Sequence, residues 1–206
     1  LVPCLASEIR MNNQYRLSRL LLANSWNNEF EYLAHTAVSR FDLHFYRYIC
    51  RETDMNVVDR SLHNSVGLEL VGLDLDKDRA VETVRTAVHH HACVLLRGQD
   101  LSPQQLRGIS RKLGVPLPPY RPQYSLDGFP EIIQVGNLCK DGHVTTYLNR
   151  GGVEWHTDSP GSSHPPGYSM LYCLESKIPD GGGETGFVST VAGYRSVPDE
   201  LKAQIA

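Results

Sequence analysis

One short segment, Trp155-His156-Thr157-Asp158, holds an imidazole and a carboxylate two residues apart. In an extended chain the side chains of residues i and i+2 project to the same face, so His156 and Asp158 can reach one metal ion. A histidine and a carboxylate, together with one further histidine, form the ligand set of non-haem Fe(II) oxygenases. Such a set leaves coordination positions open for reactants, so the segment points to oxidative chemistry at a metal.

The H-x-D spacing alone is a weak signal. With nine His and twelve Asp in the chain, about one chance match is expected in every two sequences of this composition. A histidine considered alone is also more often a surface or core residue than a metal ligand. The pair therefore gains weight only from the segments that surround it.

The elements that must position the pair have a mixed α and β pattern, judged from hydrophobic periodicity and turn residues. The expected strands are Val66–Leu75, Cys93–Leu96, Glu131–Val135, Gly167–Leu174 and Glu184–Val188. The expected helices run from a cap at Asp78 to about His90, from Ser102-Pro103 to Leu113, and onward from a cap at Ser189 or Thr190. Two apolar faces should point inward, made by Val81, Val84 and Val88 in the first helix and by Leu106, Ile109 and Leu113 in the second.

Several other stretches have plain structural readings. The segment Gly114–Pro130 holds five prolines and should be an ordered loop, whereas residues 139–152 are expected to form a mobile loop of the kind that serves as a lid. His89-His90-His91 points in three directions at a helix end, which favours solvated side chains over a metal tract. Gly181-Gly182-Gly183 lacks the rest of a phosphate-binding motif and predicts a tight turn.

Residues 1–60 differ from the rest and are interpreted as an N-terminal extension of unknown role or as a badly bounded gene segment. Residues 61–206 are interpreted as the N-terminal portion of a larger domain. Short apolar stretches at Leu20–Leu22 and Phe41–Ile49 permit helices, and we find no repeat there. The first residue is Leu1 rather than Met, which is consistent with a sequence that begins within a longer protein.

Composition limits the classes of partner. The chain has 206 residues, 41% hydrophobic and 21% charged, and a net charge of −3, which predicts a globular core and no basic surface for nucleic acid. Neither an apolar run of membrane-spanning length nor a secretory signal is evident. Five cysteines without a C-x-x-C pair argue against a disulfide framework. We therefore expect a cytoplasmic protein that acts on a small-molecule substrate; homo-oligomerisation is left open.

The order of segments carries more information than any single motif. Over roughly residues 65–206 the chain contains, in order, VGLELVGLDL, HHHACVLLRGQDLSPQQLRGISRKLG, FPEIIQV, EWHTDSP and PPGYSMLYCLESKIPDGGGETGFVST. This ordered run resembles the taurine dioxygenase-like (TauD/TfdA) family of Fe(II)/2-oxoglutarate-dependent dioxygenases.

The resemblance implies an α+β fold built on a double-stranded β-helix (jelly-roll, clavaminate synthase-like) that is incomplete at the C-terminus. It assigns His156 and Asp158 as Fe(2+) ligands and Thr185 as a residue whose hydroxyl binds a carboxylate of 2-oxoglutarate; the plain alternative for Thr185 is an exposed strand threonine. Trp155 is expected to pack in the core. The implied reaction uses O2 to hydroxylate a C–H bond while 2-oxoglutarate is decarboxylated to succinate.

The sequence also departs from the family pattern. The family's third iron ligand is a histidine far beyond the H-x-D, followed by an arginine for 2-oxoglutarate, whereas only 48 residues follow Asp158 here. Those residues contain His164 and Arg195, both too early for these roles. The family's substrate-binding histidine is also not evident, since Arg121 and its neighbours take that place. We therefore expect an N-terminal fragment with impaired activity, and taurine is a poor candidate substrate.

Two other functions stay open. One is a non-catalytic binding or regulatory protein that keeps part of the jelly-roll scaffold, which a stably folded chain ending near Ala206 would favour. The other is a metal-binding module in which a second chain supplies the missing ligand, which would make iron stoichiometry depend on assembly. A longer reading frame with a distal His and Arg would favour the oxygenase.

Overall fold

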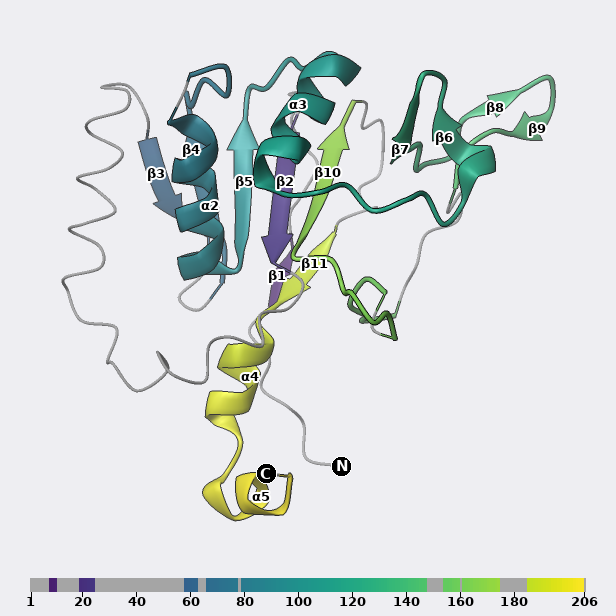
Figure 1. Cartoon of the computed structure of the whole chain (residues 1–206). Helices are drawn as coiled ribbons and strands as arrows, with labels where there is room; N and C mark the ends of the chain where they lie inside the picture. The colour runs from purple at the N-terminus through teal and green to yellow at the C-terminus, as the bar shows by residue number, and fades with distance from the viewer. Residues whose placement is uncertain are drawn as a thin grey trace. The chain divides into compact units, whose positions relative to one another are not determined.

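The structure is a computed structural model that describes residues 8–10, 19–24, 58–62, 66–77, 79–147, 154–159, 161–174 and 185–205. The chain divides into two compact units (Figure 1). The first comprises Leu1–Asn24, Glu31–Gln99 and Met170–Ala206, and the second comprises Ser25–Phe30 and Asp100–Ser169. The expectations for Asp78, Phe41–Ile49 and Gly181-Gly182-Gly183 lie outside the described residues.

The first unit is organised around a five-stranded sheet. Its strands stand in the order β10 (Tyr168–Cys173), β2 (Arg19–Asn24), β5 (Cys93–Arg97), β4 (Leu68–Val71) and β3 (Val58–Ser61). β4 and β5 pair in parallel, while β2 with β5 and β3 with β4 pair antiparallel. Parallel neighbours need a crossover, and helix α2 (Ala80–His91) provides it.

The core of this unit confirms the predicted helix face and the predicted central strand. Val81, Val84 and Val88 of α2 are all buried, and so are the first four residues of β5. The strand expected over Val66–Leu75 is shorter, because regular pairing ends at Val71 although Leu73 and Leu75 remain buried. Burying a leucine or valine side chain contributes roughly 1.5–3 kcal/mol, so this layer holds the unit together.

The first 60 residues contribute strands to this unit. The helix considered for Leu20–Leu22 is wrong, because these residues lie in β2 and Leu21 pairs with Leu95 of β5. Likewise, β1 (Glu8–Arg10) pairs antiparallel with β11 (Gly186–Val188). A run of three leucines satisfies a strand as well as a helix, so its partners across the sheet decide its conformation.

The second unit contains α3 (Pro103–Leu113), the 3-10 turn η2 (Pro122–Tyr124), and the short strands β6 (Ser125–Leu126) and β7 (Phe129–Ile133). The predicted start of α3 is confirmed. The Ser102 hydroxyl accepts from the backbone N–H of Gln105, whose side chain accepts in return from the backbone N–H of Ser102. This reciprocal capping box satisfies donors that a helix start would otherwise leave unpaired.

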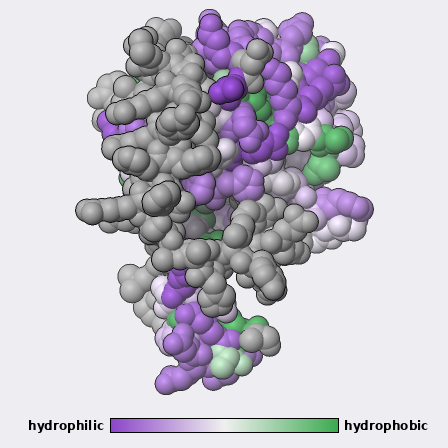
Figure 2. All heavy atoms as spheres, turned by 60° about the vertical axis from the view of Figure 1, so that its left-hand side comes forward, coloured by the Kyte–Doolittle hydropathy of each residue, from purple (hydrophilic) through white to green (hydrophobic). Residues whose placement is uncertain are grey.

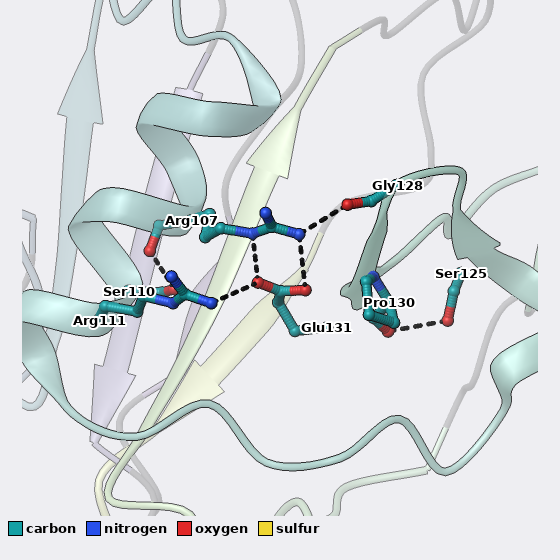
Figure 3. A network of polar contacts seen from close by, with 7 residues as sticks. All are labelled: Arg107, Ser110, Arg111, Ser125, Gly128, Pro130 and Glu131. Carbon is teal, nitrogen blue, oxygen red and sulfur yellow. Dashed lines mark hydrogen bonds and ion pairs between the residues drawn. The ribbon is translucent and has the colours of Figure 1, made fainter.

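Glu131 of β7 ties this strand to α3 (Figure 3). Arg107 donates from Nε at 2.5 Å and from a terminal nitrogen at 3.2 Å, and the same arginine reaches the carbonyl of Gly128 at 2.7 Å. Arg111 lies 3.9 Å from the carboxylate. The hydrogen bond from Arg107 is the main cause that holds the pKa of Glu131 below its ordinary value.

Part of the loop expected over residues 139–152 is a β-hairpin. β8 (Cys139–Lys140) and β9 (His143–Val144) pair through Asp141 at φ 51° and Gly142 at φ 77°. Two successive positive φ angles are those of a tight type I′ turn, for which Asp-Gly is a preferred sequence. The expected mobility of this region stays a prediction, and residues 148–152 lie outside the described part.

The last elements follow the predicted order. β10 and β11 lie within the expected strands, and Ser189 caps α4 (Thr190–Ser196) by accepting from the backbone N–H of Ala192. A further helix, α5 (Asp199–Ile205), was not expected. The described elements are thus mixed α and β with several small sheets; the double-stranded β-helix stays a prediction.

One face of the molecule is mainly polar where the structure describes it (Figure 2). On the face shown in Figure 2, most described atoms belong to hydrophilic residues and hydrophobic residues form small separate patches. Crossing a membrane takes about 20 apolar residues in one helix. None of the helices within the described ranges has that combination of length and apolar character.

Candidate metal centre

His156 and Asp158 lie together in the second unit, on a segment that precedes β10. Residues 155–157 form neither helix nor strand, yet Nε2 of His156 stands 3.7 Å from Oδ1 of Asp158. Their side chains are 67% and 53% exposed, respectively. The spacing argument thus correctly brought the two side chains together, although the strand it assumed is not formed.

A backbone carbonyl fixes the orientation of the imidazole. Nδ1 of His156 lies 2.9 Å from the carbonyl oxygen of Glu154. A carbonyl oxygen only accepts hydrogen bonds, so Nδ1 must carry the proton in this contact. In the neutral ring, Nε2 then bears the lone pair, and this is the atom that faces Asp158. The same arrangement, with the second nitrogen held by a carbonyl, is common among histidines that bind metals.

A serine orients the carboxylate. The hydroxyl of Ser169, in β10, donates a hydrogen bond to Oδ2 of Asp158. Because Oδ2 is engaged in this way, the other oxygen, Oδ1, is the one presented to His156. Ser169 escaped the sequence prediction because it lies eleven positions from Asp158, and its contact depends on how the chain folds between the two residues.

The backbone turns sharply after Asp158. Ser159 has φ of +48°, and the amide of Ser162 donates to its carbonyl oxygen at 3.1 Å. A side chain other than glycine in this left-handed region costs roughly 1–2 kcal/mol. The turn leads the chain from Asp158 back toward Ser169, whose hydroxyl reaches the carboxylate.

The pair has the electrostatic character of a cation site. With the proton on Nδ1, a lone pair of His156 and a carboxylate oxygen of Asp158 face each other across 3.7 Å. Two facing acceptors repel unless a proton or a metal ion lies between them. The geometry is thus compatible with a proton on Nε2, which gives an ordinary ion pair, and with a metal ion bound between the two atoms.

The distances also fit a first-row metal ion. Bonds from imidazole nitrogen and carboxylate oxygen to such ions measure roughly 2.0–2.2 Å. Since the two donor atoms are 3.7 Å apart, one ion can reach both, at an angle wider than the right angle between adjacent ligands of an octahedral ion. Octahedral coordination would therefore draw the two side chains slightly closer together. Imidazole with carboxylate is the donor set of the non-haem Fe(II) triad. Within the described ranges, however, no group of three or more His, Cys, Asp or Glu side chains is placed to hold a metal.

An aromatic cluster lies in the same unit. The ring of Tyr147 contacts Tyr120 edge-on at 5.7 Å and Tyr124 at 5.6 Å, and the Arg121 guanidinium lies 5.8 Å from its centre. Burial, the neighbouring Tyr147 and the charge of Asp158 raise the pKa of Tyr120. The charge of Asp158 thus acts on this cluster, which joins the proline-rich segment to Tyr147 of the segment expected to be a mobile loop.

The remaining predicted residues have mixed outcomes. Trp155 was expected in the core but is 60% exposed, because its segment is not part of a sheet and alternation of faces does not apply. His164 is an exposed loop histidine, as expected, with Nδ1 3.0 Å from the hydroxyl of Ser163. Thr185 is exposed immediately before β11 and belongs to the first unit.

The three helix-end histidines behave as solvated residues for the most part. His89 and His90 are exposed at the end of α2. Burial, followed by the adjacent His90, lowers the pKa of His91, against a smaller opposing effect of Asp59. This favours the neutral form of His91 and is consistent with the structural reading of the tract.

Comparison with known proteins gives one matching family model, described as "Taurine catabolism dioxygenase TauD, TfdA family", over residues 59–206. Pentalenolactone F synthase of Streptomyces avermitilis is 28% identical over 148 residues, covering 69% of this chain and 48% of that protein. The alpha-ketoglutarate-dependent 2,4-dichlorophenoxyacetate dioxygenase of Cupriavidus pinatubonensis is 26% identical over 168 residues, covering 73% and 56%. The alpha-ketoglutarate-dependent sulfate ester dioxygenase of Pseudomonas putida is 30% identical over 142 residues, covering 66% and 43%.

The matches cover only part of each relative. The chain spans about half the length of the curated relatives it matches, between 43% and 56% for the three named. The family match includes both residues of the His156–Asp158 pair. The family match and the local geometry therefore both involve His156 and Asp158.

Proposed function

Because the chain belongs to the TauD/TfdA dioxygenase family, we propose that it supplies two iron ligands of an Fe(II)- and 2-oxoglutarate-dependent dioxygenase. Bound iron, 2-oxoglutarate and O2 supply the oxidant that hydroxylates a C–H bond of a small molecule, with 2-oxoglutarate converted to succinate and CO2. The substrate is not fixed by the fold, since specificity depends on variable residues around the metal.

One observation carries this proposal. Nε2 of His156 and Oδ1 of Asp158 face each other at 3.7 Å, at a place where the family model matches the chain. A metal ion bound between these two acceptor atoms would remove their repulsion. The carbonyl of Glu154 holds the proton on Nδ1 of His156, which leaves the lone pair on Nε2. The chain's own residues thus bind and orient the ion, while the ion and cosubstrate supply the oxidative chemistry.

Thr185 is proposed to bind a carboxylate of 2-oxoglutarate through its hydroxyl. Its exposed position directly before β11 leaves it accessible to a ligand. The third iron ligand and the arginine for the cosubstrate have no matching residues among the 48 positions after Asp158. We further propose that residues 61–206 contribute to a jelly-roll domain and that 1–60 form an extension of unknown role.

The substrate proposed here is a small organic anion. Two relatives are named for 2,4-dichlorophenoxyacetate and for sulfate esters, both of which carry negative charge. Arg121 and the neighbouring rings of Tyr120 and Tyr147 offer a cation and aromatic surfaces in the unit that holds the His156–Asp158 pair. A cytoplasmic location is also proposed, in line with the thiols of Cys93 and Cys139, which form no disulfide.

The test is an anaerobic titration of the chain with Fe(II) and 2-oxoglutarate, following the visible charge-transfer band of the chelated metal. We expect a band in the parent chain and none in His156→Ala, because one of its two ligands is lost. His164→Ala is the matched control, since this exposed histidine lies on the same loop and should leave the band unchanged.

Absence of the band in a folded parent would contradict the assignment for this chain and favour the non-catalytic binding role. A band that survives in His156→Ala would show that iron is bound elsewhere. Iron stoichiometry that rises with chain concentration would instead favour a ligand supplied by a second copy.

A further inference from the structure

Ser169 is the side chain that the structure places behind the Asp158 carboxylate. Its hydroxyl donates to Oδ2, on the side of the carboxylate away from the oxygen that faces His156. We propose that Ser169 is a positioning residue that makes Asp158 a ligand through Oδ1 alone. This inference rests on the proposed function, since it concerns the same metal pair.

The placement of Ser169 suits this task. It lies in β10, where the backbone is extended and its side chain is half-buried. Asp158 instead lies on an irregular segment and is more than half exposed, so its own side-chain torsions would otherwise be free. The Ser169 hydroxyl, fixed on a strand, can therefore hold the Asp158 carboxylate in place, which the irregular backbone around Asp158 does not do.

Two serines of the loop that precedes β10, Ser162 and Ser163, form a useful contrast. Ser162 donates to the carbonyl of His164 at 3.0 Å, and the hydroxyl of Ser163 lies 3.0 Å from Nδ1 of the same histidine. These contacts organise the loop around a histidine outside the metal pair. The contact of Ser169, in comparison, ends on an atom of the proposed ligand itself.

The chemical consequence is a defined binding mode. When Oδ2 accepts the serine hydrogen bond, a metal is bound through the remaining oxygen and the other coordination positions stay available. Without that hydrogen bond the carboxylate can rotate, so it can bind through both oxygens or turn away. Removing outer-shell partners of metal ligands typically lowers affinity by about 10–100-fold.

The test measures Mn(II) binding to the whole chain by the electron paramagnetic resonance signal of the free ion. Four variants are compared with the parent: Ser169→Ala, Ser169→Thr, Ser163→Ala and His156→Ala. We expect Ser169→Ala to weaken binding by about 10–100-fold and Ser169→Thr, which keeps the hydroxyl, to restore most of it. Ser163→Ala should bind like the parent, and urea unfolding should be alike for both alanine variants of serine.

The outcomes separate the two proposals. Parent-like affinity of Ser169→Ala together with weakened binding by His156→Ala would overturn the role of Ser169 and leave the proposed function intact. Parent-like affinity of both variants would contradict the metal pair itself, and with it the inference. Equal loss in Ser163→Ala and Ser169→Ala would reduce the effect to disturbance of the loop.

A second measurement tests the contact without metal. In the metal-free chain, the carbon chemical shift of the Asp158 carboxylate should move in Ser169→Ala and stay in place in Ser163→Ala. An unchanged shift in Ser169→Ala would show that the hydrogen bond does not hold the carboxylate in solution, and would overturn the inference even if the chain bound no metal.

Discussion

Two carboxylates in this molecule have opposite surroundings. Glu69 of β4 is 1% exposed and accepts hydrogen bonds from Arg60 and Arg97. Asp158 is 53% exposed, accepts from an uncharged serine and faces a nitrogen of His156. The charge of Glu69 is thus compensated within the chain, whereas Asp158 and its histidine are the pair that we propose to bind a metal ion.

These surroundings shift the pKa of Glu69. Burial pushes its pKa upward, but the hydrogen bonds and charges of Arg97 and Arg60 outweigh burial, so the pKa lies below its ordinary value. A buried carboxylate with two guanidinium partners is a structural element of the sheet. The two carboxylates thus differ in their partners rather than in residue type: Glu69 is paired with two guanidinium groups, whereas Asp158 is the carboxylate that we propose as a metal ligand.

The largest expected effect is the loss of stability when the buried carboxylate of Glu69 is removed. Glu69→Ala leaves Arg97, which is only 21% exposed, without its partner inside the sheet. Breaking a buried ion pair in this way typically costs about 3–5 kcal/mol, so we expect a loss near the lower end in urea unfolding. Glu82→Ala, which breaks an exposed pair with Arg85 on α2, should cost about 0.5 kcal/mol or less; equal losses would refute the distinction.

Acid should act on the same carboxylate. Because the pKa of Glu69 is depressed in the folded chain, its stabilisation is fully present above the ordinary value of 4.5. It is lost as the pH falls through the lower folded value. Below about pH 4.5, Glu69→Gln should therefore lose stability less steeply than the parent in urea titrations. A variant with the parent's slope would show that other groups dominate acid unfolding.

A smaller loss of stability is expected at the capping box of α3, where the chain's own polar groups also satisfy one another. Ser102→Ala removes the hydroxyl that accepts from the amide of Gln105 at the start of α3. Loss of such a cap costs about 1 kcal/mol. Urea unfolding should show this loss, and Ser102→Asp, which keeps a capping acceptor, should recover most of it.

The smallest effect on stability is expected at the site itself. Asp158→Ala removes an exposed side chain that faces another acceptor, so stability should stay within about 0.5 kcal/mol of the parent. Binding of Mn(II), by contrast, should be lost. A destabilisation as large as that of Glu69→Ala would assign Asp158 a structural role and break the comparison.

Sequence reasoning succeeded where local chemistry decides the outcome. The Ser102-Pro103 start, with Gln105 three positions after the cap, specifies α3 without reference to the rest of the chain. The valines of α2 follow the helical period and are buried. In the same way, the two-residue spacing of His156 and Asp158 brought their side chains together.

It failed where distant partners decide. Leu21 is in a strand because β5 pairs with it at Leu95, and no pattern within three leucines encodes that partner. Ser169 reaches Asp158 across eleven positions, and no local pattern encodes that contact. The β8–β9 hairpin is different, since its Asp141-Gly142 dipeptide was a readable signal for a two-residue turn that was passed over.

The central claim is that the imidazole of His156 binds a metal ion next to Asp158. Pulsed electron paramagnetic resonance of the Mn(II)-loaded chain tests it most directly, because a bound imidazole nitrogen modulates the electron spin echo. The account predicts nitrogen modulation in the parent and in His164→Ala, and its loss in His156→Ala. Modulation that persists in His156→Ala and disappears in His164→Ala would place the ligand on the other loop histidine and contradict the account.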